Sequence, residues 1–463
     1  MSENWATLRE LLLPVSGRRG RQVESALRAA IRDGRLAPGV RLPSSRDLAT
    51  QLGVARGTVT AAYGQLVAEG YLVSRRGAGT SVAASVGPVD APGADAAPGP
   101  PAWRFDLRPG LPALAAFPRA EWVSATRAAL AGLPDEALGY PDPGGLAELR
   151  AELAGYLGRV RAVTATPDDV VITHGGAEAL SVLAPVLLAR GLPDIAVEEP
   201  GHPGQADLLR ANGLRPVPVQ VDSAGIVVDA LAATPCRAVV VTAAHQFPLG
   251  VALRPDRRHA LLAWARERDA VIIEDDYDAE HRYDRPALRA MQAMAPAHVA
   301  YLGSVSKTLA PALRLGWLVL PPALRADTVE RKRLTDLGCS PLPQAAFARL
   351  LRTGGYDRHL RRTRTMYRHR RDALLAAVAS SLPTWQPVGV AAGLHVVLRL
   401  PAGTDDAAVQ RRLAGRGINT PALSTYTRGG TGAPYPGLVL GYAATTPDRL
   451  RAAVAEIAAA LTA

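Results

Sequence analysis

The stretch VAYLGSVSKTLAPALRLGW, residues 299–317, decides the fold of the large C-terminal part of the chain. An apolar, strand-like run ends here at Ser304, Ser306 and Lys307, and Arg314 follows seven residues after the lysine. A lysine amine can attack an aldehyde and form an imine once its pKa is lowered, which a buried cationic neighbourhood achieves. The two hydroxyls and the guanidinium suit a phosphate dianion, which arginine binds bidentately.

Lysine is scarce in this chain. Only Lys307 and Lys332 are lysines among the 53 basic residues of the 463-residue sequence. A general bias toward arginine explains this scarcity without any function, but arginine cannot act as a deprotonated amine. An ordinary surface lysine is the alternative for Lys307, and its place at a strand end inside this stretch favours the chemical role.

Two upstream motifs supply matching chemistry. In AVIIEDDYDAEHRY, residues 270–283, a strand-like run delivers Asp275, and Tyr277 follows two residues later. A carboxylate beside a pyridine nitrogen keeps that nitrogen protonated, which makes the ring an electron sink, and a phenol can hydrogen-bond a ring oxygen. In VITHGGAEALSVL, residues 171–183, a strand gives way to a helix at Gly175–Ala177, where backbone N–H groups form an anion cradle.

The large part alternates short β-branched runs with helical stretches. This alternation predicts an α/β domain with a largely parallel sheet, whose ligands gather at the carboxyl ends of the strands. The strand-like runs are residues 170–176, 194–200, 238–245, 270–277 and 299–307, and the clearest helical stretches between them are 177–190 and 255–269.

These motifs, in this order, resemble the fold-type I pyridoxal-phosphate (PLP) enzymes of the aspartate aminotransferase superfamily over about residues 105–463. The resemblance implies that Lys307 is the Schiff-base lysine, Asp275 the partner of the pyridine nitrogen and Tyr277 the partner of the 3-oxygen. His202 stands above the ring, where the family usually has tyrosine. Tyr140 is expected to reach the phosphate of a neighbouring subunit, which implies a homodimer. The residues expected to bind the phosphate within the chain are Gly176, Ala177, Ser304, Ser306 and Arg314.

The first 82 residues read as a separate basic module. Residues 1–80 hold twelve arginines, no lysine and six acidic residues, a formal net charge of +6, which is typical of a nucleic-acid binder and also of a solvated basic face. In RLPSSRDLATQLGVARGTVTAAYGQLVAEGYL, residues 41–72, a helix capped by Ser44 or Ser45 runs through Gln51, Gly53 makes the turn, and a second helix spans 56–69. Residues 71–82 then predict a hairpin wing.

This string resembles the GntR family of winged helix-turn-helix regulators, and the resemblance implies DNA binding. Ala55 and Gly57 depart from the residues that the family often has there, so no operator is predicted. The expected phosphate or base-edge contacts are Ser44, Ser45 and Arg46, the expected base contacts are Arg56, Gly57 and Thr58, and the expected wing contacts are Arg75 and Gly79.

A GntR-type module joined to an aminotransferase-like domain is the architecture of the MocR/GabR regulators. We therefore expect a winged helix-turn-helix at 1–82, a linker rich in Pro, Ala and Gly at 83–103, and a PLP-binding domain at 104–463. The resemblance implies a homodimer, head-to-tail, whose DNA binding responds to PLP, to an amine or amino-acid effector, or to both.

The sequence departs from working aminotransferases at several positions. Phe247 takes the place of an Asn that binds the 3-oxygen, next to His245 and Gln246. Val439, in LVLGYAA, takes the place of the Arg that clamps the substrate carboxylate, and an apolar side chain cannot pair with a carboxylate. Gly204 offers no side chain at a position where the GABA-responsive member binds its effector's carboxylate.

Three functions stay open at this point. The first is a regulator that responds to PLP and an amine or amino acid. The second is a regulator of vitamin B6 genes that responds to PLP alone, and the third is a transaminase that carries a DNA-binding head. Substitution of the missing clamp by Arg399, Arg428 or another arginine is the alternative to a changed effector.

The composition narrows the cellular setting. The chain has no run of 18 apolar residues and a poor secretory signal, so we expect neither a membrane partner nor export. Cys236 and Cys339 lie far apart and form no metal or redox motif, so we expect a reducing cytoplasm and no metal.

Overall fold

The computed structural model describes residues 20–75, 79–84, 103–284, 288–428 and 433–462. Internal contacts divide the chain into two compact units, Met1–Pro101 and Ala102–Ala463, which we call the head and the large unit. None of the helices described in these ranges is long and apolar enough to cross a membrane.

Within residues 20–75 and 79–84, the head contains three helices and a two-stranded hairpin. Ser44 caps the second helix, since its hydroxyl accepts a hydrogen bond from the backbone N–H of Asp47 (3.2 Å). Gly53 ends that helix in the left-handed conformation (φ 63°), which glycine adopts at little cost. The elements are α1 (Gly20–Arg32), α2 (Ser45–Leu52), α3 (Arg56–Ala68), β1 (Leu72–Arg75) and β2 (Gly79–Val82), with β1 and β2 antiparallel. The helix-turn-helix and wing expected from the sequence are therefore present.

Apolar residues at helical spacing form the core of the head. Val59, Tyr63 and Leu66 of α3 pack against Leu27 of α1 and Leu48 of α2. These positions lie on one face of each helix, so the opposite face of α3 stays exposed. Gly57 lies on that exposed face, and Arg56 is exposed at the first position of the helix.

An eight-stranded sheet forms the centre of the large unit, in the order β4-β11-β10-β9-β8-β5-β6-β7. Strands β10, β9, β8, β5 and β6 run parallel, while β11 is antiparallel to both its neighbours and β7 is antiparallel to β6. The strands are β4 (Val170–Thr173), β5 (Asp194–Glu199), β6 (Arg215–Asp222), β7 (Gly225–Ile226), β8 (Ala238–Val241), β9 (Val271–Asp275), β10 (Val299–Ser304) and β11 (Gly316–Val319). The predicted α/β class with a mostly parallel sheet is confirmed.

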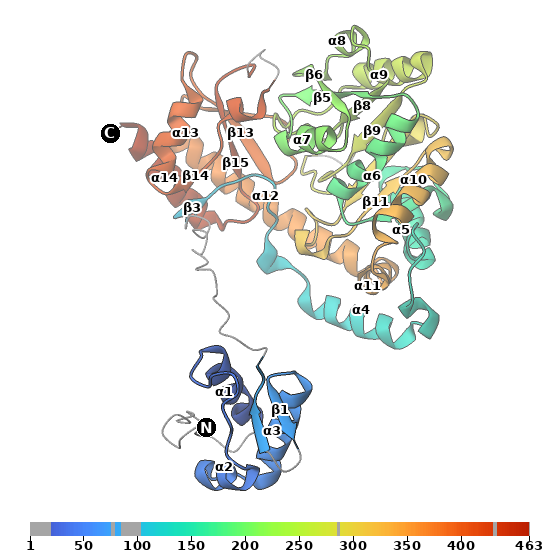
Figure 1. Ribbon diagram of the computed structural model, residues 1–463. Helices are drawn as coiled ribbons and strands as arrows, with labels where there is room; N and C mark the ends of the chain where they lie inside the picture. The colour runs from blue at the N-terminus through green and yellow to red at the C-terminus, as the bar shows by residue number, and fades with distance from the viewer. Residues whose placement is uncertain (1–19, 76–78, 85–102, 285–287, 429–432, 463) are drawn as a thin grey trace. The chain divides into compact units, whose positions relative to one another are not determined.

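Helices cover both faces of this sheet (Figure 1). Alternate strand residues point to opposite faces, so Leu302 packs under α6, α7 and α10, while Tyr301 packs under α4, α5 and α11. Helices α8 and α9 extend the second layer. The helices are α4 (Arg119–Gly132), α5 (Ala147–Arg161), α6 (Gly176–Ala189), α7 (Pro203–Ala211), α8 (Val228–Ala232), α9 (Pro255–Arg268), α10 (Pro322–Asp336) and α11 (Pro341–Arg352).

The C-terminal part of the large unit has its own small core. The long helix α12 (Gly355–Ser381) packs against α14 (Pro447–Thr462), and both border the antiparallel sheet β12-β13-β15. The first strand of the large unit, β3 (Phe105–Asp106), pairs in parallel with β14 (Ile418–Asn419). The remaining elements are β12 (Gln386–Val388), β13 (His395–Arg399), α13 (Asp406–Ala414), β15 (Gly437–Gly441) and the 3-10 segments Leu114–Ala116, Asp135–Leu138, Pro167–Asp169, Gln292–Met294, Pro311–Leu313 and Leu423–Tyr426.

Candidate cofactor pocket and DNA-binding surface

A pocket of about 390 Å³ lies at the carboxyl ends of β5, β9 and β10 and at the start of α6. Parallel strands bring their carboxyl ends to one edge of a sheet, so residues from distant parts of the sequence meet there. The pocket is lined by nine of the ten residues that the sequence associates with PLP, namely Gly176, Ala177, His202, Asp275, Tyr277, Ser304, Ser306, Lys307 and Arg314.

The amine of Lys307 lies in this pocket. Its Nζ donates a hydrogen bond of 2.8 Å to the carbonyl oxygen of Gly110. Burial lowers the pKa of Lys307, and the nearby Asp278 and Asp275 partly oppose that shift. Desolvation rather than cationic neighbours therefore brings this lysine towards the free amine that imine formation requires.

Asp275 ends β9 on the pocket side. Burial raises the pKa of its carboxyl to about 7, and the neighbouring Asp276 adds to the shift. The amide of Gln205 donates to its Oδ2 at 3.3 Å. A carboxylate that is costly to hold charged is stabilised by a cation beside it, so Asp275 favours a protonated nitrogen in the pocket.

Tyr277 lies two residues beyond Asp275 and is held at its hydroxyl. The hydroxyl donates to the carbonyl oxygen of His245 at 3.0 Å and lies 3.2 Å from Nδ1 of the same residue. His245 is fixed in turn by Asp278, whose Oδ2 is 2.9 Å from Nδ1. The phenol ring is therefore positioned from behind by a buried polar network.

Another part of the pocket, formed by Arg314 and the start of α6, is suited to an anion. Gly175 has a φ of 89° and no Cβ, and a Cβ there would lie 3.2 Å from Nη1 of Arg314. The guanidinium of Arg314 therefore lies against the turn at which α6 begins. Helix α6 presents its first N–H groups, at Gly176 and Ala177, to the same pocket.

His202 and Phe247 line the side of the pocket. Their ring centroids are 5.6 Å apart, with an interplanar angle of 40°. Burial lowers the pKa of His202, and the nearby Lys307 adds to that effect. His202 is therefore a neutral ring at neutral pH, able to stack on a flat ligand.

Tyr140 does not line the pocket. Its side chain is 90% exposed in the single chain. Such exposure leaves the phenol available to another subunit, which is the role that the sequence predicts for it.

Several residues of this pocket lie outside the motifs that the sequence reveals. Gly110 and Gln205 contact Lys307 and Asp275 directly. Glu198 is buried in the pocket wall, where burial raises its pKa to about 7 and the hydroxyl of Thr242 donates to it at 2.5 Å. Of these residues, only Glu198 could have been predicted from the sequence, because it lies near the carboxyl end of a strand.

The head has a groove of about 550 Å³ between α2, α3 and the hairpin. Of the predicted DNA contacts, Ser44, Ser45 and Gly79 line it, and Nε of Arg56 is 3.4 Å from the hydroxyl of Ser45. The groove also contains Arg41, which the sequence analysis did not single out. The other predicted contacts Arg46, Gly57 and Arg75 are exposed, and Thr58 is half-buried.

Comparison with known proteins identifies the family that each unit matches. The family of bacterial regulatory proteins called gntR matches residues 19–82, and the family of class I and II aminotransferases matches residues 113–457. The pyridoxine biosynthesis transcriptional regulator PdxR of Corynebacterium glutamicum is 36% identical and covers 95% of both chains. This chain is a member of the MocR/PdxR-type transcriptional regulators.

Other relatives agree with this assignment. The probable rhizopine catabolism regulatory protein MocR of Rhizobium meliloti is 34% identical over 95% of this chain and 93% of its own. Among solved structures, α-aminoadipate aminotransferase LysN of Thermus thermophilus has 27% identity and a TM-score of 0.69, covering 77% of this chain and 92% of its own. A MocR-type regulator with a GntR head binds DNA, and its large unit has the fold of class I and II aminotransferases.

The two positions at which the sequence predicts a missing carboxylate partner in this MocR-type chain are Val439 and Gly204. Val439 is fully buried in an apolar cluster with Val397 and Leu423. Gly204 lies against the ring of His202, since a Cβ there would be 3.1 Å from its Cε1. Both positions therefore lack a cation, as the sequence indicates.

Arg399 and Arg428, the two possible replacements for the missing carboxylate-binding arginine, lie in different places. Arg399 is on the surface and stacks over Tyr435, with 5.2 Å from its Cζ to the ring centroid. Arg428 forms an ion pair with Asp207 and lines a second pocket of about 280 Å³, which shares His202 and Glu198 with the first. Arg428 is therefore the better placed of the two.

Proposed function

We propose that this protein is a PLP-binding transcription regulator, whose affinity for DNA changes with occupancy of the pocket by PLP, alone or with an amine or amino acid. The proposal depends on one observation: the half-buried amine of Lys307 shares a pocket with Asp275 and with the first residues of α6. The described residues fit each part of the cofactor. When bound, PLP supplies an aldehyde for imine formation and a ring that accepts electrons.

Each pocket residue has a proposed role. Lys307 attaches the aldehyde, Asp275 holds the ring nitrogen protonated, Tyr277 hydrogen-bonds the 3-oxygen, and His202 stacks on the ring. The phenol of Tyr140 binds the phosphate in the pocket of the partner subunit of a head-to-tail homodimer. The phosphate is bound within the chain by Gly176, Ala177, Ser304, Ser306 and Arg314.

In the head, we assign the phosphate and base contacts to one surface. The domains are proposed to be 1–82 for the DNA-binding head, 83–103 for the linker and 104–463 for the PLP-binding part. Backbone phosphates fix the position of such a module on the duplex, and base edges supply the sequence preference. The proposed DNA contacts are Ser44, Ser45, Arg46, Arg56, Gly57, Thr58, Arg75 and Gly79.

A second candidate is a regulator of vitamin B6 genes in which PLP itself is the effector. The buried Val439 and the bare Gly204 favour it, because neither offers a cation to an amino-acid carboxylate. The relative PdxR, named for pyridoxine biosynthesis, supports the same idea. A transaminase is the third candidate, supported by 32% identity to 2-aminoadipate transaminase of Thermus thermophilus over 65% of this chain and 77% of that one.

One set of measurements tests the proposal. The full chain, stripped of cofactor, is titrated with PLP while binding to an operator selected from random duplexes is measured. The titration is then repeated with PLP and each of a panel of amines and amino acids. A change with PLP alone supports the second candidate, a further change with an amine supports the first, and DNA affinity indifferent to both contradicts the proposal. Sustained turnover with an amino donor and a keto acid supports the transaminase.

A further inference from the structure

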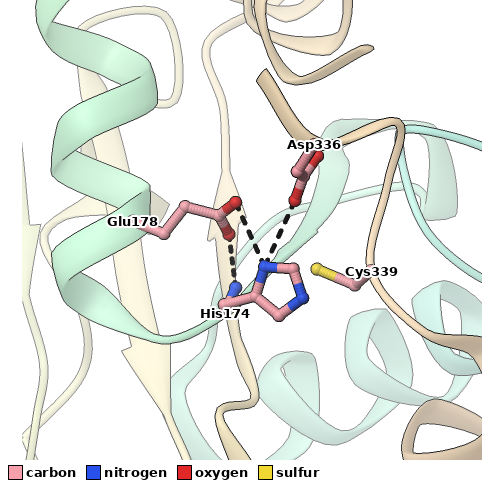
Figure 2. A group of neighbouring side chains, drawn as sticks. All are labelled: His174, Glu178, Asp336 and Cys339. Carbon is pink, nitrogen blue, oxygen red and sulfur yellow. Dashed lines mark hydrogen bonds and ion pairs between the residues drawn. The ribbon is translucent and has the colours of Figure 1, made fainter. Parts of the chain in front are cut away.

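Four potential metal ligands meet at the turn between β4 and α6. His174 lies in that turn and Glu178 in the first turns of α6, while Asp336 ends α10 and Cys339 lies in the loop before α11. One ligand atom of each residue lies within 4.8 Å of the ligand atoms of the others. Figure 2 shows all four side chains pointing towards one centre from two separate parts of the chain.

The carboxylates converge on the imidazole. Nδ1 of His174 is 3.2 Å from Oε1 of Glu178 and 3.2 Å from Oδ2 of Asp336 (Figure 2). The other oxygen of each carboxylate is held by backbone: His174 N–H donates to Oε2 of Glu178, and Gly338 N–H donates to Oδ1 of Asp336 at 2.9 Å. The two acids are therefore oriented before any ligand arrives, which lowers the cost of binding one.

One side of the cluster is buried and another side is exposed to solvent. Cys339 forms the buried side, with 2% of the residue exposed, and its thiol lies 3.7 Å from the carbonyl oxygen of Ile172. The side chain of His174 is 39% exposed. An ion can therefore reach the cluster from solvent past the imidazole and contact a thiol sheltered from solvent.

Lys332 belongs to the surroundings of the cluster. Its fully buried Nζ lies 2.6 Å from Oδ2 of Asp336 and 3.1 Å from Oε1 of Glu178. Two carboxylates and a thiolate carry three negative charges, and a divalent ion together with this ammonium carries three positive charges. The ammonium thus makes an occupied site neutral, which a buried site requires.

We propose that His174, Glu178, Asp336 and Cys339 bind a divalent transition metal of the zinc class. Thiolate and imidazole ligands favour such ions over Mg²⁺ and Ca²⁺, which prefer oxygen alone. Four protein ligands fill a tetrahedral shell and leave no position for substrate, so the ion is structural or regulatory rather than catalytic.

The bound ion would join two parts of the large unit that the sequence keeps far apart. It would tie the β4–α6 turn to the C-terminal end of α10. His174 is followed directly by Gly175, which lies against Arg314 in the proposed cofactor pocket. The same turn therefore contributes His174 to the metal site and Gly175 to the anion cradle.

Cobalt is the probe that tests this site. The full chain is treated with a chelator and titrated with Co²⁺ in the absence of PLP. We expect one equivalent per chain, with d–d absorption of tetrahedral intensity and a thiolate-to-cobalt charge-transfer band. Zn²⁺ should then displace the cobalt and raise the unfolding temperature, because an ion that binds only the folded state stabilises it.

The two cysteines provide a matched pair of variants. Cys339→Ser should remove the charge-transfer band and weaken Co²⁺ binding by more than about tenfold, since loss of even an outer partner costs ~10–100-fold. Cys236→Ser changes the other buried cysteine, outside the cluster, and should behave as wild type. Glu178→Gln is the second ligand variant should Cys339→Ser fail to fold.

The outcomes are separable from the proposed function. Wild-type protein that takes up no Co²⁺ at concentrations well above its own overturns the site, as does an unchanged charge-transfer band in Cys339→Ser. Neither result depends on whether PLP binds, because the measurement is made on cofactor-free protein.

Discussion

The amine of Lys307 is bonded to the backbone carbonyl of Gly110, 197 residues earlier in the chain, at 2.8 Å. Gly110 lies in the segment that enters the large unit just after the region joining it to the head. Attachment of an aldehyde to Lys307 removes the free amine that makes this bond. The proposed cofactor site therefore contacts the first segment of the large unit, which is the part of the fold closest in sequence to the DNA-binding head.

Substitution of Gly110 tests this contact. Gly110 has a φ of 84°, and a Cβ there would lie 3.3 Å from Nζ of Lys307. Gly110→Ala should weaken PLP binding about tenfold, because the left-handed conformation costs an alanine about 1–2 kcal/mol and the methyl group crowds the amine. Gly403→Ala, also at positive φ but with open space around it, is the control for strain alone. Equal PLP affinities in the two variants would contradict the role of the contact.

Replacement of Lys307 tests the attachment. Lys307→Ala should abolish the visible absorbance band of the imine and leave the far-UV circular dichroism unchanged, because the side chain contributes an amine rather than core packing. Borohydride reduction followed by peptide mass spectrometry should place the cofactor on residue 307 of the wild type. A visible band of normal strength in Lys307→Ala would refute the assignment.

The stability of the cofactor-free protein should depend on pH through Asp275. The pKa of this carboxyl is about 7 in the folded state, above its ordinary value of 3.8. Its contribution to the free energy of unfolding is therefore full below about pH 4 and is lost as the pH rises through 7. Asp275→Asn removes this loss. The free energy of unfolding of the variant, relative to that of the wild type, should increase by about 1–2 kcal/mol from pH 5 to pH 8. This is less than the full pKa shift implies, because solvent in the pocket screens the carboxyl.

Denaturant unfolding at the two pH values measures this difference. Asp256→Asn, at an exposed carboxylate in α9, is the matched control and should show no comparable gain. A gain for Asp275→Asn that is the same at pH 5 and pH 8 would show that the carboxyl does not titrate in this range.

The sequence predicts most of the pocket because its chemistry is local. A lysine, an aspartate and a helix start at strand ends must meet at one edge of a parallel sheet, and the structure brings Lys307, Asp275 and Gly176 into one cavity. Gly110 and Gln205 could not be found this way, since each contributes through tertiary packing and neither belongs to a strand-end motif.

The proposed metal cluster shows more clearly what cannot be predicted from the sequence. From the sequence we expected no metal, since two distant cysteines make no ligand spacing. His174 with Glu178 and Asp336 with Cys339 are two short pairs, each unremarkable alone, that come together only because α10 packs beside α6. Ligands shared between distant segments leave no periodic signal in the chain.

Two exposed arginines of the head, Arg46 and Arg56, are proposed to make different kinds of DNA contact. Arg46 is exposed in α2, and Arg56 begins α3 with its Nε near Ser45. Arg46→Ala should lower the slope of log affinity against log salt by about one, because one phosphate contact is lost. Arg56→Ala should cost about 1–3 kcal/mol on the selected operator and much less on unrelated DNA, because a base contact discriminates between sequences. Arg412→Ala, at an exposed arginine of α13 in the large unit, should change neither quantity. Salt titrations of fluorescence anisotropy on both duplexes measure these effects, and a slope unmoved by Arg46→Ala would count against its phosphate contact.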